Sequence, residues 1–421
     1  MEPEDLQKTA HSYALQGKSF FLTGGAGTGK TYTLHSIIKS LKENKKRVAV
    51  TACTDIALQQ FDSEAKTLHS FAGYSFETKQ FDSFTHNWNN FDVLIIDEIS
   101  SLSSIEFKAI EKSAQLARGN DLPMGGMQTI GCGDFYQLPP TYNNNPLLDR
   151  DKKIEKHTSV VRDKSRYKVI KYAFSTSRWD VVFPSMVNLT KVHRQTDMEF
   201  INILNRIRSD NYLEGVLEYI IENCGTTFNP EAPYIYATNK QVNETNNFKA
   251  SKLKTCIKYT DKSQNLMSLA VGVPVIGLVN TDQMKNGSRG VVVGFEHNGQ
   301  PYDIDSPEPG IGHPLSVFPV IQFQGYDEPS VIYMVDSEIF PIAYGWAMTI
   351  QSSQGMTFES LNVDVSKCTS AGQVYVALSR VPDPSKMNVE GYHDSLVKHG
   401  RFVSFFYYSH LPIERIPGDP E

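Results

Sequence analysis

Alternating apolar and amphipathic segments divide the first half of the chain into predicted strands and helices. Residues 20–23 form an apolar run typical of a buried strand, residues 32–41 have helical periodicity, and residues 48–50 form a second apolar run. A strand, a helix and a strand in this order predict a βαβ unit in a parallel sheet. Residues 93–96 and 127–131 predict further strands, so we expect an α/β domain.

The second half repeats this pattern, is interrupted, and then resumes it. A helical pattern at residues 200–208 and an apolar run at 234–237 continue the α/β arrangement. Between about residues 273 and 342, short alternating strands are separated by turn sequences such as Asn286-Gly287. This segment predicts a small β-barrel insert. Helix and strand patterns return from residue 345.

Composition limits the class of protein. A chain of 421 residues with 40% apolar residues is long enough for two to four domains. No apolar run approaches the roughly 18 residues that cross a bilayer, and the acidic start at residues 1–7 resembles neither a signal peptide nor a transit peptide. The five cysteines are scattered and form no C-x-x-C pair, so we expect reduced thiols, no zinc site and an intracellular location.

Charge is informative only locally. A net charge of −6 and a pI near 6.0 do not fit a protein that coats nucleic acid nonspecifically, but they allow one basic groove. Residues 149–171 hold nine Lys or Arg against four acids. This stretch is either a nucleic-acid contact or a solvated loop.

Residues 24–31 read Gly-Gly-Ala-Gly-Thr-Gly-Lys-Thr and match the phosphate-loop pattern G-x-x-x-x-G-K-[ST]. The glycines allow the backbone to curl so that its N–H groups point at phosphate oxygens. Lys30 would then reach the β and γ phosphates, while Thr31 would bind Mg²⁺ at the start of the next helix. A glycine-rich loop also arises by chance, but the flanking strand and helix favour nucleotide binding.

Carboxylates and amides elsewhere complete a candidate hydrolysis site. The strand at residues 93–96 ends in Asp97-Glu98, where Asp97 would hold Mg²⁺ and Glu98 would deprotonate the attacking water. Gln137 follows the strand at residues 127–131 and could touch the γ-phosphate. Gln7 heads an amphipathic helix, where it either reads adenine or is simply solvated.

Polar strand ends suggest contacts to a nucleic-acid backbone. Residues 51–57 and 67–71 bring hydroxyl groups and the imidazole of His69 to the predicted ligand edge of the sheet, and Phe71 could stack on a base. Helix caps and core aromatics would explain the same residues. Residues 73–91 have no clear period and carry several aromatic rings, which predicts a small excursion from the domain.

Taken in order, these and later segments resemble the motifs of superfamily 1B helicases. The matching segments, which extend from Gln7 to Arg380, are residues 24–31, 51–57, 67–71, 97–100, 133–140, 192–195, 349–355 and 375–380. Residues 107–111, 117–118 and 123–128 look like a degenerate form of the Pif1 signature, so the chain resembles the Pif1 family more than the RecD-like or phage Dda-like branches. Asp55 stands where the family commonly has Gly, and Gln351-Ser352 where it has His-Lys, which puts one basic DNA contact in doubt.

The resemblance implies an α/β fold with two RecA-like P-loop domains in tandem, a small 1B wedge insert and an SH3-like β-barrel 2B insert. The expected boundaries are 1–72 and 92–183 for domain 1A, 73–91 for 1B, 184–268 and 342–421 for 2A, and 269–341 for 2B.

The resemblance also implies roles residue by residue. Catalytic roles fall to Lys30, Glu98, Gln137, Arg194 and Arg380. The nucleotide would be contacted by Gln7, Gly25, Gly27, Thr28, Gly29, Lys30, Thr31, Tyr32 and Gly355. Mg²⁺ would be bound by Thr31 and Asp97. DNA would be contacted by Thr54, Thr67, His69, Phe71, Asn239 and Ser353.

The implied function is an ATP-dependent DNA helicase that moves 5′–3′ on single-stranded DNA and unwinds forked or tailed duplex DNA as a monomer. The resemblance alone suggests a place in DNA replication, repair, recombination or telomere maintenance. A DNA-stimulated ATPase that acts as a switch without unwinding remains an alternative. A GTPase is disfavoured because Asn239-Lys240 is followed by Gln241-Val242, which does not complete the guanine-reading motif. A small-molecule kinase has no use for a second α/β half.

Overall fold

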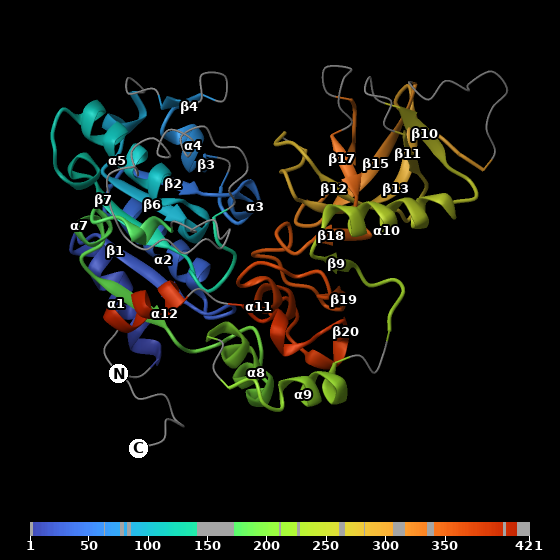
Figure 1. Ribbon diagram of the computed structural model, residues 1–421. Coiled ribbons are helices and arrows are strands. Elements are labelled where there is room, and N and C mark those ends of the chain that lie inside the picture. Colours follow the sequence, from blue (N-terminus) through green and yellow to red (C-terminus); the bar gives the residue numbers. More distant parts are fainter. Residues whose placement is uncertain are drawn as a thin grey trace, which may run out of the picture. The chain divides into compact units, whose positions relative to one another are not determined.

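The computed structural model describes residues 3–62, 64–75, 80–81, 86–140, 172–209, 212–224, 228–260, 266–281, 283–305, 316–334, 341–398 and 401–410. The basic stretch at residues 149–171 lies outside the described residues. The chain forms two compact units (Figure 1). Unit 1 comprises Met1–Glu214, Thr369–Pro382 and Val397–Glu421, and unit 2 comprises Gly215–Cys368 and Asp383–Leu396.

Unit 1 is built on a six-stranded parallel sheet (Figure 1). The strands, in spatial order, are β3 (Lys66–Thr67), β2 (Val48–Ala52), β6 (Val93–Asp97), β7 (Gln128–Cys132), β1 (Phe20–Gly24) and β8 (Met186–Leu189). Leu22 lies opposite Cys132 on one side and Val187 on the other. Because parallel strands share a direction, the loops that follow Gly24, Asp97 and Cys132 leave the sheet at the same edge.

Both faces of this sheet are covered, which explains the continuous apolar runs at residues 20–22 of β1 and 93–96 of β6. Phe20 and Leu22 belong to one core, which includes residues of α1 (Pro3–Leu15) and α2 (Lys30–Glu43). Phe21 points to the opposite core, where its ring centroid is 5.2 Å from that of Trp179. This second core includes residues of α5 (Ser104–Arg118), α7 (Trp179–Val182) and α12 (Arg401–His410).

Local signals set the ends of several helices. Helix α5 begins with a capping box in which Ser103 and Glu106 exchange hydrogen bonds, and it ends at Gly119 in the left-handed conformation. Among the described residues, unit 1 also contains the α-helices and strands α3 (Asp55–Leu58), α4 (Leu68–Phe71), β4 (Tyr74–Ser75), β5 (Gln80–Phe81), α8 (Met198–Ser209) and α11 (Gln373–Leu378). Strands β4 and β5 form a short antiparallel hairpin inside the expected 1B range.

Unit 2 contains a second parallel sheet. Its strands, in spatial order, are β18 (Ala347–Thr349), β9 (Tyr234–Tyr236), β19 (Leu361–Asp364) and β20 (Met387–Glu390). Ile235 lies at the centre, opposite Met348 and Val363. The α-helices in the described part of this unit are α9 (Val216–Asn223) and α10 (Asn239–Ser251), and α10 begins directly after β9 with Thr238 as its N-cap.

The predicted β-rich segment is also present in unit 2. Its antiparallel sheet has the order β16 (Ser330–Val331), β15 (Val317–Phe323), β13 (Arg289–His297), β12 (Pro274–Gly277) and β17 (Ile342–Tyr344), and β14 (Gln300–Pro301) pairs with β13. A separate hairpin joins β10 (Ile257–Thr260) to β11 (Leu266–Leu269). Strand β15 alternates buried and half-buried residues, as its sequence period predicts.

The expected domain boundaries differ from the structure at several places. Helices α8 and α11 lie within the range expected for the second domain, but they belong to unit 1. Strand β8 was expected in the second domain, but it pairs with β1. Helix α12 was also expected there, but its Phe406 packs into the core of unit 1. The β-rich core extends from Leu253 to Trp346, beyond the expected range of 269–341. Hydrophobic periodicity identifies an element but not the sheet or core that it joins, so these assignments needed three-dimensional contacts.

Candidate nucleotide site

The phosphate loop links β1 to α2 and requires glycine at two positions. Gly27 and Gly29 have φ angles of 77° and 83°, in the left-handed region. A Cβ atom on Gly27 would lie 2.6 Å from the Cβ of Arg194. The backbone of residues 193–194 lies directly on the loop, since the His193 N–H donates to the Gly27 carbonyl at 2.7 Å.

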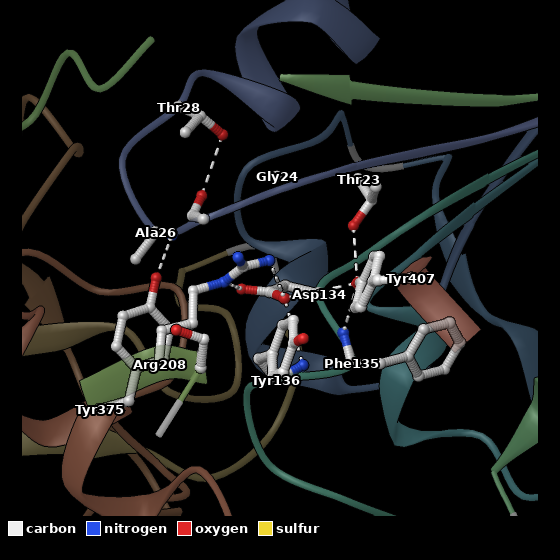
Figure 2. Close-up of polar contacts among 12 residues, drawn as sticks. Thr23, Gly24, Ala26, Thr28, Asp134, Phe135, Tyr136, Arg208, Tyr375 and Tyr407 are labelled. Carbon is white, nitrogen blue, oxygen red and sulfur yellow. Dashed lines mark hydrogen bonds and ion pairs between the residues drawn. The ribbon is translucent and has the colours of Figure 1, made fainter. Parts of the chain in front are cut away.

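Lys30, the first residue of α2, folds back over this loop. Its ammonium donates to the carbonyl oxygens of Gly24 and Gly25 at 2.9 and 3.0 Å. The hydroxyl of Thr28 donates to the same Gly25 carbonyl at 2.9 Å (Figure 2). Thr31 is half-buried in the first turn of α2. A cation within a curled loop at a helix N-terminus is a suitable site for phosphate.

The acidic pair Asp97-Glu98 ends β6 at the same edge. Asp97 is buried, and this burial raises the pKa of its carboxyl. Glu98 has a φ of 51°, which is uncommon for a residue with a side chain, and its N–H donates to Asp97 Oδ1 at 2.9 Å. Burial and the charge of Asp97 raise the pKa of Glu98 to about 7, while Lys30 and Arg380 oppose this rise. A carboxyl that titrates near neutral pH can act as a general base.

The loop after β7 is organised by a buried ion pair. Asp134 accepts two hydrogen bonds from Arg208, from Nε at 3.0 Å and from Nη2 at 2.8 Å (Figure 2). The Asp134 side chain is fully buried, and 16% of the Arg208 side chain is exposed. The Tyr136 N–H donates to the Asp134 carboxylate and the Gln137 N–H to the Asp134 backbone carbonyl, so Asp134 shapes the loop that carries Gln137. Gln137 itself is buried.

Aromatic residues surround this ion pair. The Arg208 guanidinium lies 4.5 Å from the ring centroid of Tyr136, which stacks on Tyr407 at 4.9 Å. The Tyr407 hydroxyl is hydrogen-bonded to Thr23 on β1 at 2.8 Å and accepts from the Phe135 N–H at 3.1 Å (Figure 2). Helix α12 therefore joins the strand before the phosphate loop to the loop after β7.

Two further arginines lie close together in unit 1. Arg194 donates to the carbonyl of Ser379 at 3.1 Å. The Nε of Arg380 donates to the carbonyl of Val376 at 2.7 Å, and Nη2 to the Ser379 hydroxyl at 2.8 Å. Arg380 is 1% exposed, and burial together with the charge of Arg194 lowers its pKa to about 9. The half-buried Arg194 cation beside the fully buried Arg380 cation favours an anion between or beside them.

The other predicted nucleotide contacts vary in position. The Gln7 amide nitrogen would lie 3.1 Å from a Cβ atom placed on Gly29, so Gln7 is beside the phosphate loop. Tyr32 is 74% exposed on α2. Gly355 belongs to unit 2, where it has a φ of 82°.

Three of the DNA contacts predicted in unit 1 already interact with neighbouring residues of the chain. Thr54 and Thr67 are N-caps whose hydroxyl oxygens accept from Ala57 N–H and Ser70 N–H. His69 lies 3.4 Å from a carboxylate oxygen of Glu106.

Phe71 requires a correction. This residue is 3% exposed, and its ring packs edge-on against Trp88 at 4.9 Å. Because Trp88 and other core side chains cover its ring, Phe71 is a core residue. The prediction that it stacks on a base is therefore wrong.

In unit 2, Asn239 is exposed at the first position of α10. Ser353 differs from the expectation of a DNA contact, because it is fully buried and its hydroxyl donates to the Ile350 carbonyl at 2.7 Å. Its neighbour Ser352 is half-buried and hydrogen-bonded to the Thr349 hydroxyl at 2.9 Å.

Sequence reasoning did not assign roles to Asp134, Arg208, Tyr375 or Tyr407. Two of them, Asp134 and Tyr375, lie within segments that carry the resemblance, namely residues 133–140 and 375–380. Their partners lie far away in sequence, 74 residues in the case of Asp134 and Arg208. No local pattern could have revealed these pairings.

Comparison with known proteins places this geometry in a family. Residues 6–215 match the family model of the PIF1-like helicases. ATP-dependent DNA helicase PIF1 from Danio rerio is 28% identical, covering 93% of this chain and 62% of the relative. The Homo sapiens protein of the same name is 29% identical, covering 93% of this chain and 61% of the relative. The chain thus spans about three fifths of the length of these relatives.

Solved structures agree. The crystal structure of Pif1 helicase from Candida albicans matches with a TM-score of 0.76 and 28% identity, over 96% of this chain and 98% of that one. Pif1 helicase from Bacteroides in complex with ADP-AlF3 and single-stranded DNA matches with a TM-score of 0.73 and 25% identity, over 96% and 97% of the two chains.

The protein is therefore an α/β P-loop protein with two RecA-like domains, as predicted from the sequence. Within that class, the chain belongs to the PIF1-like helicase family. No helix in the described part of the chain is both long and apolar enough to cross a membrane.

The Asp134–Arg208 pair generates a stability prediction. Asp134→Asn leaves the Arg208 cation in a buried site without its counter-charge. We therefore expect the free energy of unfolding to fall by about 3 kcal/mol or more. Urea unfolding followed by tryptophan fluorescence measures this effect, because Trp88 and Trp179 both lie in the core of unit 1.

Asp92→Asn is the matched control. Asp92 also accepts two side-chain hydrogen bonds from one arginine, Arg47, but this pair is solvent-exposed. Exposed pairs contribute little, so the control should unfold almost as the wild type does. Equal losses in the two variants would contradict the role given to burial of the Asp134–Arg208 pair.

Proposed function

We propose that this protein is an ATP-dependent DNA helicase that translocates 5′–3′ on single-stranded DNA and unwinds duplex DNA. The observation that carries the proposal is the geometry of the phosphate loop, where the Lys30 ammonium lies on the Gly24 and Gly25 carbonyls at the start of α2 and the pair Asp97-Glu98 ends β6 at the same edge of the sheet. A loop for phosphates, a carboxylate base and a buried arginine are the parts of a nucleoside-triphosphate hydrolysis site. The names of the relatives, ATP-dependent DNA helicase PIF1, favour ATP as the substrate.

Each part has a proposed role in hydrolysis. The loop amides of Gly25, Gly27, Thr28 and Gly29 and the Lys30 ammonium hold the phosphates. Thr31 and Asp97 hold Mg²⁺. Among the described residues no group of three or more His, Cys, Asp or Glu could hold a metal by itself, so phosphates and water would supply the other ligands.

The remaining residues act on the reacting phosphate and on the base. Glu98 deprotonates the attacking water and Gln137 contacts the γ-phosphate. Arg194 and Arg380 neutralise the charge that develops as the phosphoryl group is transferred. Gln7 and Tyr32 contact the nucleoside, and Gly355 contributes from unit 2.

For DNA, we propose backbone contacts from both units. The hydroxyls of Thr54 and Thr67 use an oxygen lone pair for their caps and can still donate to a phosphate. His69 and the exposed Asn239 add contacts. The protein would move along a strand if the two DNA-binding units came together on ATP binding and moved apart after hydrolysis. We further propose that hairpin β4–β5 is the 1B wedge, that the β-rich part of unit 2 is the 2B insert, and that the free cysteines reflect an intracellular site of action.

The test is unwinding of duplex DNA carrying either a 5′ or a 3′ single-stranded tail. We expect ATP hydrolysis stimulated by single-stranded DNA, and strand separation from the 5′ tail only. Lys30→Ala should abolish both activities because it removes the cation that compensates the phosphates. Lys39→Ala is the control, since Lys39 lies exposed on the same helix.

The outcomes separate the candidate functions. DNA-stimulated hydrolysis without unwinding would favour the alternative of a DNA-dependent ATPase switch. Equal unwinding from both tails would remove the support for 5′–3′ movement.

Glu98 gives a pH-dependent prediction. Its pKa is raised to about 7, so the carboxylate needed by a general base is depleted below that pH and dominant above it. The kcat/KM for hydrolysis without DNA should therefore rise with pH and level off above a midpoint near 7. Glu98→Gln should bind nucleotide but not hydrolyse it. A profile that stays flat between about pH 6 and 8 would show that another group activates the water.

A further inference from the structure

Tyr375 of α11 makes a direct contact with the phosphate loop. Its hydroxyl accepts a hydrogen bond from the backbone N–H of Ala26 at 2.6 Å, although the two residues are 349 positions apart (Figure 2). The same oxygen would lie 3.2 Å from a Cβ atom placed on Gly25. Tyr375 therefore ties a short helix to the loop that the proposed function assigns to ATP phosphates.

The surroundings keep this hydroxyl protonated. Tyr375 is 3% exposed, and burial together with the charge of Asp134 raises its pKa to about 12, with Arg208 and Arg380 opposing the rise. A neutral phenol at neutral pH accepts from the Ala26 N–H without adding a negative charge beside the phosphates. The contact thus positions the loop and does not compete for its cations.

The other end of α11 is linked to Arg380. The Arg380 side chain donates back to the Val376 carbonyl at 2.7 Å, so its direction is set by the helix. The carbonyl of Ser379, the C-cap of α11, accepts a hydrogen bond from Arg194 at 3.1 Å. Any shift of α11 relative to the phosphate loop would therefore move Arg380 as well.

The start of α11 is held at the same place. Its N-cap, Gly372, has a φ of 74°, and a Cβ atom there would lie 2.2 Å from the Gln137 carbonyl oxygen. The helix is consequently packed against the loop that carries Gln137 while Tyr375 reaches the phosphate loop.

We propose that Tyr375 is a positioning residue for ATP hydrolysis, whose hydroxyl fixes α11, and with it Arg380, in register with the phosphate loop. The inference rests on the proposed function, because it assumes that the loop binds ATP. A purely structural tyrosine would instead support folding without a selective effect on the chemical step.

Tyr375→Phe removes the hydroxyl and leaves the ring. We expect kcat for DNA-stimulated hydrolysis to fall about three- to tenfold, the effect of one lost hydrogen bond. The affinity for ADP, measured by fluorescence of a labelled nucleotide, should stay within error because the phosphate contacts remain. Tyr259→Phe is the control, since it removes another buried hydroxyl, one that donates to the Val317 carbonyl in unit 2.

The decisive measurement is the pair of substitutions. If Tyr375 acts through Arg380, then Tyr375→Phe should cause no further loss of kcat in an Arg380→Ala background. If the kcat losses of the two single variants multiply in the double variant, the two residues act independently and the proposal is overturned. An unchanged kcat, or weakened ADP binding with kcat unchanged, would overturn it too.

The wild type separates this inference from the function on which it rests. If the wild type does not hydrolyse ATP, the proposed function fails and the positioning role fails with it. If the wild type hydrolyses ATP and the Tyr375→Phe variant matches it, only the positioning role fails.

Discussion

The structure of unit 1 depends on one buried ion pair, between Asp134 and Arg208. Removing either charge leaves the other buried, without hydration and without its ion-pair partner, which destabilises the fold. Asp134 shapes the loop that carries Gln137 by accepting from the Tyr136 and Gln137 N–H groups, and Arg208 also lies beside Gly25 of the phosphate loop. Tyr407 adds the C-terminal helix through Thr23 and Phe135. Segments from both ends of the chain thus meet at the end of β1.

Around this pair, the charges are arranged for an anion. Lys30 lies within the phosphate loop, and Arg380 is so deeply buried beside Arg194 that its pKa falls to about 9. At the end of β6, burial and the charge of Asp97 raise the pKa of Glu98 to about 7. Bound phosphates would bring negative charge to the two arginines, and a divalent cation would bring positive charge to the two carboxylates. Each would offset the repulsion between like charges.

The parts that could be predicted from the sequence have local signals. Strand β1, the phosphate loop and α2 follow from an apolar run, four glycines and a helical period, and β6 with Asp97-Glu98 follows in the same way. Burial and long-range pairing leave no such signal. Phe71 and Ser353 lie in motif-like segments yet face the interior, while Tyr375 and Arg208 find partners that are distant in sequence.

The most direct measurement compares how tightly the protein holds ADP alone and ADP with aluminium fluoride, which imitates the transferring phosphoryl group. We expect the wild type to bind ADP much more tightly when aluminium fluoride is present. Arg380→Ala should lose about 10³-fold of that gain while its affinity for ADP changes little. If the Arg380→Ala variant instead binds ADP with aluminium fluoride as tightly as the wild type does, then Arg380 does not stabilise phosphoryl transfer at this loop.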